Sequence, residues 1–328
     1  MICEEVRRAI TIAPEMTAQP FPRKEAVVIV NPAAHHAPRR KRVVEAQEWL
    51  RERGWKCEWL ETTRAAESIR MAQAAARREV PLLFVWGGDG TLNEAANGLA
   101  KSETALSVIP SGTTNLWARE VGLLKRPLEA IGLTLEGARR RVDLGLAGSR
   151  YFLLMAGFGI DAAVVQRVSR GVKGRLGAAA YALAAVRQVM SYRGSRLTLS
   201  MDGEERVADV LMVVAGNTRN YAGLTKITPE AVIDDGRLDV CVYKGRGRWD
   251  IVWLAILTLL RQHGRSKNVL RRRVKLLKIT NGMPLPAQLD GEAIGDSPPE
   301  VTVVRDALWV VTPRSLTSPL FSQPPEPQ

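Results

Sequence analysis

The first part of the chain alternates short apolar runs with longer segments in which apolar side chains recur three and four positions apart. The short runs predict buried strands, and the longer segments predict amphipathic helices. The expected strands are residues 26–30, 57–60, 81–86 and 105–109, and the expected helices between them are residues 39–53, 65–78 and 91–100. Strands that are apolar throughout and alternate with helices are typical of a parallel sheet covered by helices. We therefore expect a three-layer α/β domain over residues 23–142.

The pattern changes near Asp143, where several runs alternate apolar and polar side chains and Asp-Gly pairs separate them. Such runs predict antiparallel strands joined by tight turns. The expected strands are residues 151–155, 196–201, 207–215, 238–243, 274–280, 300–304 and 308–311, with helices at residues 178–190 and 249–260. We expect residues 143–316 to form a mostly antiparallel β-sandwich domain. Residues 1–22 are expected to be a flexible tail and residues 317–328 a disordered one.

Basic side chains are concentrated in two segments of the second half. The whole chain has 47 lysines and arginines against 34 aspartates and glutamates, a net charge of +13. Residues 167–196 contain seven basic residues and no acid, and residues 246–278 contain ten basic residues and the single acid Asp250. Because these segments together exceed the net charge of the whole chain, the rest of the protein is slightly acidic. This distribution favours an anionic partner, whether nucleic acid, a membrane surface or a phosphate-bearing ligand.

A glycine-rich loop, residues 87–91 (GGDGT), lies between an expected strand and an expected helix. Glycines permit positive φ angles and let backbone N–H groups approach an anion, and the helix that follows directs its positive end to the same place. The loop therefore predicts a nucleotide-phosphate site. Phosphates repel a carboxylate such as Asp89 unless it binds Mg²⁺ or takes a proton. The alternative interpretation is a tight turn in which Asp89 caps a helix.

Three more polar segments follow expected strands. They are Asn31-Pro32, Thr62-Thr63 and residues 110–115 (PSGTTN). In an open parallel sheet, ligands bind outside the carboxyl ends of adjacent strands. Since all four polar loops lie at that edge, we expect a single nucleotide site there. A Walker A loop is excluded, because the chain contains no Gly-Lys pair.

Seven segments, in order along the chain, resemble the diacylglycerol kinase catalytic-domain family, which includes bacterial lipid kinases and sphingosine kinases. They are Asn31-Pro32, residues 87–99 (GGDGTLNEAANGL), 110–120 (PSGTTNLWARE), 142–145 (VDLG), 157–161 (GFGID), 234–239 (DDGRLD) and 289–292 (LDGE). The GGDGT segment alone is also typical of NAD kinases and phosphofructokinases, but the ordered set is more specific. The chain departs from many relatives at residues 33–36 (AAHH), where those relatives have a loop containing Ser-Gly.

The resemblance implies an active site in the cleft between an amino-terminal α/β domain and a carboxyl-terminal β-sandwich. It implies that ATP contacts Asn31, Thr62, Gly87, Gly88, Gly90, Thr91, Asn93, Glu94, Gly112, Thr113 and Asn115. It makes Asp89 and Glu292 alternative general bases, with Asp89 also a candidate for Mg²⁺-ATP and Asp290 a third catalytic residue. It implies a water-linked Mg²⁺ network at Asp143 and a structural Mg²⁺ at the turn Asp235-Gly236-Arg237, with Asp235 as the side-chain ligand.

Two functions remain open from the sequence. The first is an ATP- and Mg²⁺-dependent lipid kinase that acts on a diacylglycerol-like hydroxyl at a membrane surface. The second is a soluble small-molecule kinase of the NAD kinase type. Residues 249–260 (WDIVWLAILTLL) are apolar and flanked by arginines, which favours insertion into an anionic interface, although a buried core helix explains them equally well. In the first function, the basic segments 167–196 and 246–278 dock the protein on the membrane.

We expect no nucleic-acid partner. Aromatic side chains that could stack on bases do not interleave with the basic runs, and a nucleic-acid-binding function would leave the acids of the motifs without a role. Three dispersed cysteines indicate a reducing cytoplasm, and we expect the protein at the inner face of the plasma membrane. The sequence determines neither the lipid acceptor nor the oligomeric state, and a homodimer stays open. Replacing Asp89 by alanine is expected to abolish phosphoryl transfer with little effect on folding.

Overall fold

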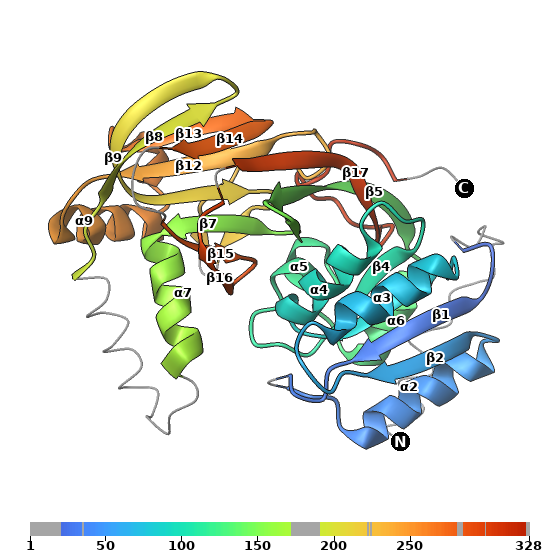
Figure 1. Ribbon diagram of the computed structural model, residues 1–328. Coiled ribbons are helices and arrows are strands. Elements are labelled where there is room, and N and C mark those ends of the chain that lie inside the picture. Colours follow the sequence, from blue (N-terminus) through green and yellow to red (C-terminus); the bar gives the residue numbers. More distant parts are fainter. Residues whose placement is uncertain are drawn as a thin grey trace.

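The computed structural model describes residues 21–34, 36–171, 191–221, 223, 225–280, 285–298 and 300–325. Its amino-terminal half alternates strands and helices, as the sequence predicts (Figure 1). These elements are β1 (Glu25–Val30), α2 (Arg40–Glu52), β2 (Lys56–Glu61), α3 (Glu67–Arg77), β3 (Leu82–Gly87), α4 (Asp89–Leu99), β4 (Ala105–Pro110), α5 (Leu116–Glu120) and α6 (Pro127–Leu135). The short helices α5 and α6 are additional to the predicted ones.

The first four strands form a parallel sheet in the order β4-β3-β1-β2. Alternate side chains of β1 enter opposite layers. Val27 and Ile29 pack with side chains of α3 and α4, whereas Ala26 and Val28 pack with side chains of α2 and α6. Burial on both faces explains why these strands are apolar throughout. The predicted three-layer α/β domain is confirmed, and its topology brings the four polar loops to one edge of the sheet.

The carboxyl-terminal half is built mainly from strands, and its ladders are antiparallel. Its elements are β5 (Ala138–Ala147), β6 (Arg150–Phe152), β7 (Met155–Gly159), α7 (Ile160–Gly171), β8 (Ser195–Met201), β9 (Glu204–Gly216), β10 (Asn220–Tyr221), β11 (Thr225–Lys226), β12 (Leu238–Lys244), α9 (Arg248–Leu259), the 3₁₀ helix η1 (His263–Arg265), β13 (Val269–Val274), β14 (Leu276–Thr280), β15 (Pro286–Leu289), β16 (Glu292–Asp296) and β17 (Glu300–Thr312). The strands enclose an apolar core that includes Phe152, Phe158 and Leu277. The predicted antiparallel domain is confirmed.

Strand β17 joins the two sheets. It pairs antiparallel with β14 and β5 and, through Trp309 and Val310, parallel with β4 of the amino-terminal sheet. A register shift between Val304 and Leu308 lies inside this one strand, where the sequence had indicated two separate strands. The predicted domain boundary at residues 142–143 falls within β5, which also pairs with β17.

The carboxyl-terminal segment is ordered through residue 325, so the prediction of a disordered tail at residues 317–328 is wrong for the part that the structure describes. Leu320 is fully buried in the core of the protein. The backbone N–H groups of Ser322 and Gln323 donate to the Asp234 carboxylate at 2.7 and 2.8 Å. One apolar anchor and one carboxylate therefore hold a proline-rich segment that has no regular structure.

The prediction of a flexible tail is wrong at Phe21. Phe21 is buried, and its ring meets Trp55 edge to face with 5.7 Å between centroids. Residues 1–20 of the predicted tail lie outside the described residues. The expected helix at residues 178–190 also lies outside them, as does most of the basic segment 167–196.

Candidate active site

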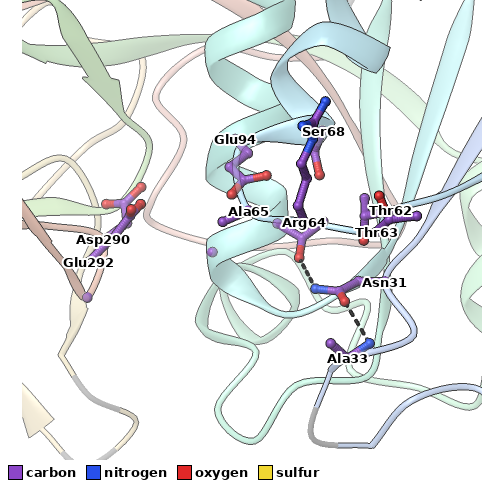
Figure 2. A pocket seen from close by; sticks show the side chains of 13 residues that line it. Asn31, Ala33, Thr62, Thr63, Arg64, Ala65, Ser68, Glu94, Asp290 and Glu292 are labelled. Atoms are coloured by element: carbon purple, nitrogen blue, oxygen red, sulfur yellow. Dashed lines mark hydrogen bonds between the residues drawn. The ribbon is translucent and has the colours of Figure 1, made fainter. Parts of the chain in front are cut away.

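A cavity of about 520 Å³ lies between the two domains. One wall comes from the loops after β1 and β2 and from the first turn of α4, and the other comes from the turn between β15 and β16 (Figure 2). The lining residues are Asn31, Ala33, Thr62, Thr63, Arg64, Ala65, Ser68, Gly90, Thr91, Glu94, Asp290, Gly291 and Glu292. The structure therefore brings predicted nucleotide loops and two predicted catalytic acids, far apart in the sequence, to one cavity.

Hydrogen bonds between loops hold the amino-terminal wall. Asn31 Nδ2 donates to Thr91 Oγ1 at 2.8 Å, and this contact ties the loop after β1 to α4. Glu94 Oε1 accepts the Ala66 N–H at 2.8 Å and ties α4 to the loop after β2. Between these contacts lies Gly90, where an added Cβ would meet no atom within 4 Å. The first turn of α4 is therefore open to the cavity, and the start of a helix is suited to bind a phosphate.

The loops after β3 and β4 approach closely, which requires glycine at position 112, and the expectation of a positive-φ turn at residues 87–91 is wrong. Gly87, Gly88 and Gly90 are not among the glycines with positive φ. A Cβ added to Gly112 would lie only 2.8 Å from the Gly88 Cα, so the loops after β3 and β4 touch backbone to backbone. Glycine is required here because it has no side chain, since both backbones would otherwise have to move.

The carboxylate of Asp89 is directed at the first turn of α5. Asp89 Oδ2 accepts the Leu116 N–H at 3.0 Å, and Asp89 Oδ1 accepts the Trp117 N–H at 3.3 Å. Burial raises the pKa of Asp89, against the effect of these two donors and of the Arg119 charge. Asp89 therefore caps α5, which follows a different loop. Contrary to the alternative interpretation, it does not cap α4, because Asp89 is the first residue of α4 and Gly88 is the N-cap. Truncation to alanine would leave two N–H groups without this acceptor, so we now expect a loss of stability in addition to the loss of phosphoryl transfer.

Asp290 and Gly291 form the turn of the β15–β16 hairpin, with positive φ angles of 49° and 85°. The Asp290 carboxylate accepts the N–H groups of Leu153, Leu154 and Met155 at 2.8 to 2.9 Å. Burial raises the pKa of Asp290 to about 7, the three donors oppose the rise, and the Asp89 charge adds to it. A carboxyl group that titrates near neutrality in a cavity is a candidate for proton transfer.

Glu292 is the accessible acid of the cavity. Its side chain is 53% exposed, and its Oε2 pairs with Arg150 Nη2 of β6 at 2.7 Å. Both oxygens of Asp89 accept bonds from α5, whereas Glu292 lines the cavity itself. Of the two general bases that the resemblance implies, the geometry favours Glu292. Arg150, which the sequence did not indicate, holds the Glu292 side chain in place.

A buried polar cluster supports the hairpin. The Tyr221 hydroxyl donates to Asp161 Oδ1, and Gln288 Nε2 donates to Asp161 Oδ2 at 2.9 Å. Gln288 Oε1 in turn accepts the Gly291 N–H at 2.7 Å, so the cluster reaches the turn that carries Asp290. Burial raises the pKa of Asp161 and, together with the Asp161 charge, the pKa of Tyr221. Asp161 belongs to the GFGID segment, for which sequence reasoning proposed no role.

Six of the eleven predicted nucleotide residues do not line the cavity: Gly87, Gly88, Asn93, Gly112, Thr113 and Asn115. Asn115 Oδ1 accepts the Gly112 N–H at 2.8 Å and shapes the second loop. Asn93 is buried, and its Oδ1 accepts from Asn97 Nδ2 at 2.9 Å. Asn97, which sequence reasoning missed, bonds both backbone polar groups of Tyr151 at 2.8 and 2.9 Å. This side of α4 therefore joins the two domains.

Arg64 and Ser68 line the cavity and were not predicted. Arg64 is the only lysine or arginine among the lining residues. Ser68 lies in the first turn of α3, is 1% exposed, and its Oγ has no hydrogen-bond partner within the part of the chain that the structure describes. A cation and an unpartnered hydroxyl at a helix start are suited to a phosphate. Their position directly after the polar pair Thr62-Thr63 was the signal that could have found them.

The structural Mg²⁺ site expected at residues 235–237 does not fit the structure. The Asp235 Oδ2 atom pairs with the Arg273 guanidinium, and its Oδ1 accepts the Arg237 N–H at 2.9 Å. Arg273 therefore supplies the positive charge that a metal ion would bring. Asp143, the third predicted metal residue, is buried, and its oxygens accept backbone N–H groups of Gly236 and Asp306 at 2.6 and 2.9 Å. Within the described residues, no group of three His, Cys, Asp or Glu side chains could hold a metal ion.

A Mg²⁺ ion that arrives with a nucleotide makes smaller demands. Mg²⁺ usually keeps several waters and binds one or two carboxylates together with substrate phosphates. Glu94, Asp290 and Glu292 bring three carboxyl groups to the cavity, the first from the wall with Gly90 and the others from the opposite wall. Hard oxygen donors on both sides of a phosphate-binding turn fit a nucleotide-bound Mg²⁺, whereas they do not form a cage for a permanent ion.

An α/β domain with strand-end loops, opposed across a cavity by acids from an antiparallel domain, is the arrangement expected of a two-domain phosphotransferase. Residues 25–147 match the diacylglycerol kinase catalytic domain, and residues 155–312 match the YegS C-terminal NAD kinase beta sandwich-like domain. The chain belongs to the diacylglycerol kinase catalytic-domain family, which confirms the resemblance. It is an enzyme of the lipid kinase class, which transfers a phosphoryl group to a hydroxyl.

Similar proteins match nearly the whole chain. The diacylglycerol kinase of Bacillus subtilis (strain 168) is 28% identical over 294 residues, which cover 89% of this chain and 97% of that protein. The diacylglycerol kinase of Staphylococcus carnosus (strain TM300) is 26% identical over 296 residues, covering 90% and 97%. A crystal structure of a provisionally assigned diacylglycerol kinase from Bacillus anthracis str. Sterne has a TM-score of 0.75 at 23% identity, covering 92% of this chain and all of the other. That likeness supports the fold.

Proposed function

We propose that this protein is an ATP- and Mg²⁺-dependent kinase that phosphorylates the hydroxyl of diacylglycerol, or of a closely related lipid, at a membrane surface. The observation that carries the proposal is the shared cavity, in which the strand-end loops of one domain face Asp290 and Glu292 of the other. Two similar proteins named diacylglycerol kinase, which this chain matches along almost their full length, support the choice of acceptor.

The amino-terminal wall binds the nucleotide in this proposal. The open first turn of α4 at Gly90 receives phosphate oxygens, and Asn31 keeps the adjacent Thr91 hydroxyl in place. Arg64 adds a positive charge on the same wall. Phosphoryl transfer requires positioning and stabilisation of the charge on the transferred group, and a helix start together with a guanidinium supplies both.

The opposite wall handles the acceptor. The lipid hydroxyl lies near Glu292. The Glu292 carboxylate takes the hydroxyl proton as the oxygen attacks the terminal phosphorus of ATP, and the bond from that phosphorus to the bridging oxygen breaks to release ADP. Arg150 orients Glu292 through their ion pair. Asp290, whose pKa burial raises to about 7, is largely neutral below that pH, and this limits its repulsion of the phosphates. Glu94 would hold a Mg²⁺ ion that arrives with the nucleotide phosphates, and such an ion would offset the phosphate charge.

A labelled-ATP assay against a panel of acceptors tests the proposal. The panel is diacylglycerol, a long-chain base, phosphatidylglycerol and a polyprenol, each in detergent micelles, together with NAD in solution. We expect phosphate on diacylglycerol with Mg²⁺, and none with EDTA in its place. Phosphorylation of NAD instead of a lipid would identify the soluble alternative, and transfer to none of the acceptors would contradict the proposal.

We place the reaction at the inner face of the plasma membrane, because ATP and the lipid acceptor are both present there. Charge supports this location: in the segment 246–278, ten basic residues stand against Asp250 alone. Anionic headgroups attract such a surface, and the attraction weakens as salt screens it.

A further inference from the structure

Helix α9 presents an apolar face that nothing in the described structure covers. Trp249 is 72% exposed, Trp253 56%, Ile256 44% and Leu260 60%. These four residues follow one another at spacings of four, three and four, so they lie in one stripe along the helix. Two exposed tryptophans in one helix are unusual on a surface that faces only water. The stripe continues onto Leu259, which is 67% exposed.

The opposite face of α9 anchors the helix to the domain. Ile251 and Leu254 are buried in the core. The Thr258 hydroxyl lies 3.1 Å from the Tyr243 hydroxyl, and the Thr258 carbonyl accepts from Thr225 Oγ1 at 3.0 Å. The alternative of a buried core helix therefore holds only for the face with Ile251 and Leu254, because the opposite face is exposed. The exposed stripe is a fixed feature of a helix that is docked on its other side.

Positive charge surrounds the stripe. Arg248 begins the helix, Arg261 follows its last turn, and Arg265 and Lys267 lie just beyond. None of these four forms an ion pair with another described residue. Two acids lie near the start of the helix, and both are occupied. Asp250 Oδ2 accepts the N–H groups of Arg246 and Gly247 at 3.0 and 3.1 Å, and Asp209 Oδ2 pairs with Arg246 Nε at 2.7 Å. The stripe therefore has a cationic border without a compensating acid.

We propose that α9 is the membrane-insertion element of this protein, and that its occupant is an anionic phospholipid bilayer. Tryptophan and leucine side chains enter the interface while the arginines and Lys267 remain at the headgroups, with the helix lying in the membrane plane. None of the helices in the described part of the chain is both long and apolar enough to cross a bilayer. A second copy of this face is a poor partner, because pairing would bring the same positive charges together.

Figure 1 places α9 at the end of the carboxyl-terminal domain, on the side remote from the parallel sheet. Insertion there attaches the acceptor-handling domain to the membrane and leaves the nucleotide domain in water. This inference rests on the proposed function for its meaning, since a lipid kinase needs its acceptor delivered from a membrane. Vesicle binding nevertheless tests it independently of phosphoryl transfer.

The test compares the whole chain with two matched triple variants. The first, Trp249→Ser/Trp253→Ser/Leu260→Ser, removes the stripe, and the control, Val44→Ser/Leu124→Ser/Val207→Ser, removes three exposed apolar side chains elsewhere. Each is mixed with vesicles of phosphatidylcholine containing phosphatidylglycerol, or of phosphatidylcholine alone, and floated on a density gradient. We expect the wild type and the control to bind the anionic vesicles. The stripe variant should bind at least about tenfold more weakly, because it lacks the three apolar side chains that would enter the bilayer.

Salt and fluorescence separate insertion from simple attraction. Insertion of the stripe should shift the tryptophan emission of the wild type to shorter wavelength. High salt should weaken vesicle binding, because it screens the attraction of Arg261 and Arg265 to the headgroups. The protein that remains bound should keep its shifted emission. Equal binding by the stripe variant and the wild type would overturn the proposal. The proposal would also be overturned if the wild type did not bind vesicles but formed a concentration-dependent dimer that the stripe variant did not form.

An activity arm keeps the two proposals distinguishable. Short-chain diacylglycerol in detergent micelles needs no bilayer, so the stripe variant should phosphorylate it at the wild-type rate. Vesicle binding without transfer to any lipid would support α9 insertion and overturn the proposed function. Transfer to micellar lipid together with stripe-independent vesicle binding would support the function and overturn the α9 proposal.

Discussion

Asp89 shows how one carboxylate can hold a loop and serve a site. Its two oxygens accept N–H groups from α5, and its charge is close enough to Asp290 to raise the pKa of that residue. We expect Asp89→Ala to lose activity and about 1–3 kcal/mol of unfolding free energy, because two donors lose their acceptor. Asp89→Asn keeps one acceptor oxygen, so its loss of stability should be much smaller. It removes the charge that acts on Asp290, so kcat should still fall about a hundredfold if Asp89 takes part in proton transfer or in binding Mg²⁺-ATP. Urea unfolding and the kinase assay measure the two effects.

Asp202→Asn is the matched control for this comparison. Asp202 Oδ1 also accepts two backbone N–H groups, from Lys275 and Leu276 at 2.9 Å each, but Asp202 lies in the turn between β8 and β9 and its charge is not among those that shift the pKa of Asp290. It should show a similar small stability change with wild-type activity. Activity of Asp89→Asn within a few-fold of wild type would remove Asp89 from the catalytic machinery and leave it a helix cap.

Arg64 is the cation that the sequence motifs did not identify. If it contacts phosphates of ATP, Arg64→Ala should raise the KM for ATP about tenfold, the effect of losing roughly one charge-assisted contact. The KM for the lipid should not change. Arg70→Ala should change neither constant, because Arg70 lies in α3, is 63% exposed and does not line the cavity. An unchanged KM for ATP in Arg64→Ala would exclude Arg64 from nucleotide binding.

At this scale the motifs predicted position better than role. Asn31, Thr62, Gly90, Thr91 and Glu94 line the cavity as expected, because they lie at strand ends or on one face of the first turns of α4. Asn93 belongs to the same segment but lies on another face of that helix, where it meets Asn97. Successive positions in an α-helix differ by about 100°, so the helix period separates residue 93 from residue 94, which a motif written as a string of letters does not.

Among the elements, the β15–β16 hairpin is the one on which the proposed chemistry depends. Its turn is supported by the chain of contacts from Tyr221 through Asp161 and Gln288 to Gly291. We expect Tyr221→Phe to lower kcat about tenfold while the KM for ATP stays constant, because a less firmly held turn misplaces the acids and not the nucleotide. Steady-state kinetics and the pH profile of kcat measure this, since a displaced Asp290 should shift the profile.

Tyr243→Phe is the matched control. Tyr243 is also buried and its hydroxyl also meets a side chain, Thr258 at 3.1 Å, but the contact lies beneath α9 and away from the cavity. It should leave kcat and the pH profile unchanged. Equal losses in the two variants would mean that Tyr221 contributes only general stability.

The elements that the sequence predicted are those with a clear period. The strands and helices of residues 25–110 are within a few residues of their predicted bounds, because both faces of that sheet are buried. The short helix α5 was missed, since its five residues are too few to show a period and its start is fixed by Asp89 from another helix. The ordered segment after β17 was missed because Asp234, far away in sequence, holds it.

At the scale of the whole molecule, the two domains share more than a cleft. β17 pairs with strands of both sheets, Asn97 bonds Tyr151, and Glu120 Oε1 accepts the N–H groups of Arg219 and Asn220 at 3.0 and 2.7 Å. These contacts fix the width of the cavity in the structure. Sequence reasoning could assign each wall to a domain, but the contacts between domains pair residues far apart in the chain and leave no local pattern.

Stability of the whole fold should depend on pH through Asp239, which lies buried in β12. Burial and the Glu230 charge raise the pKa of Asp239 to about 6, against Arg271 and Arg219. The ordinary pKa of aspartate is about 3.9, so the unfolded chain loses this proton first as the pH rises. The free energy of unfolding therefore falls between about pH 4 and pH 6, and the loss stays constant above that range. The full cost is about 3 kcal/mol, from roughly two pKa units.

Asp239→Asn has no such dependence. We expect its unfolding free energy, measured in urea at intervals from pH 4 to 7, to rise relative to wild type up to about pH 6 and then to stay parallel. Since every other titrating group cancels in the difference, two curves that are parallel throughout would show that Asp239 titrates normally in the fold.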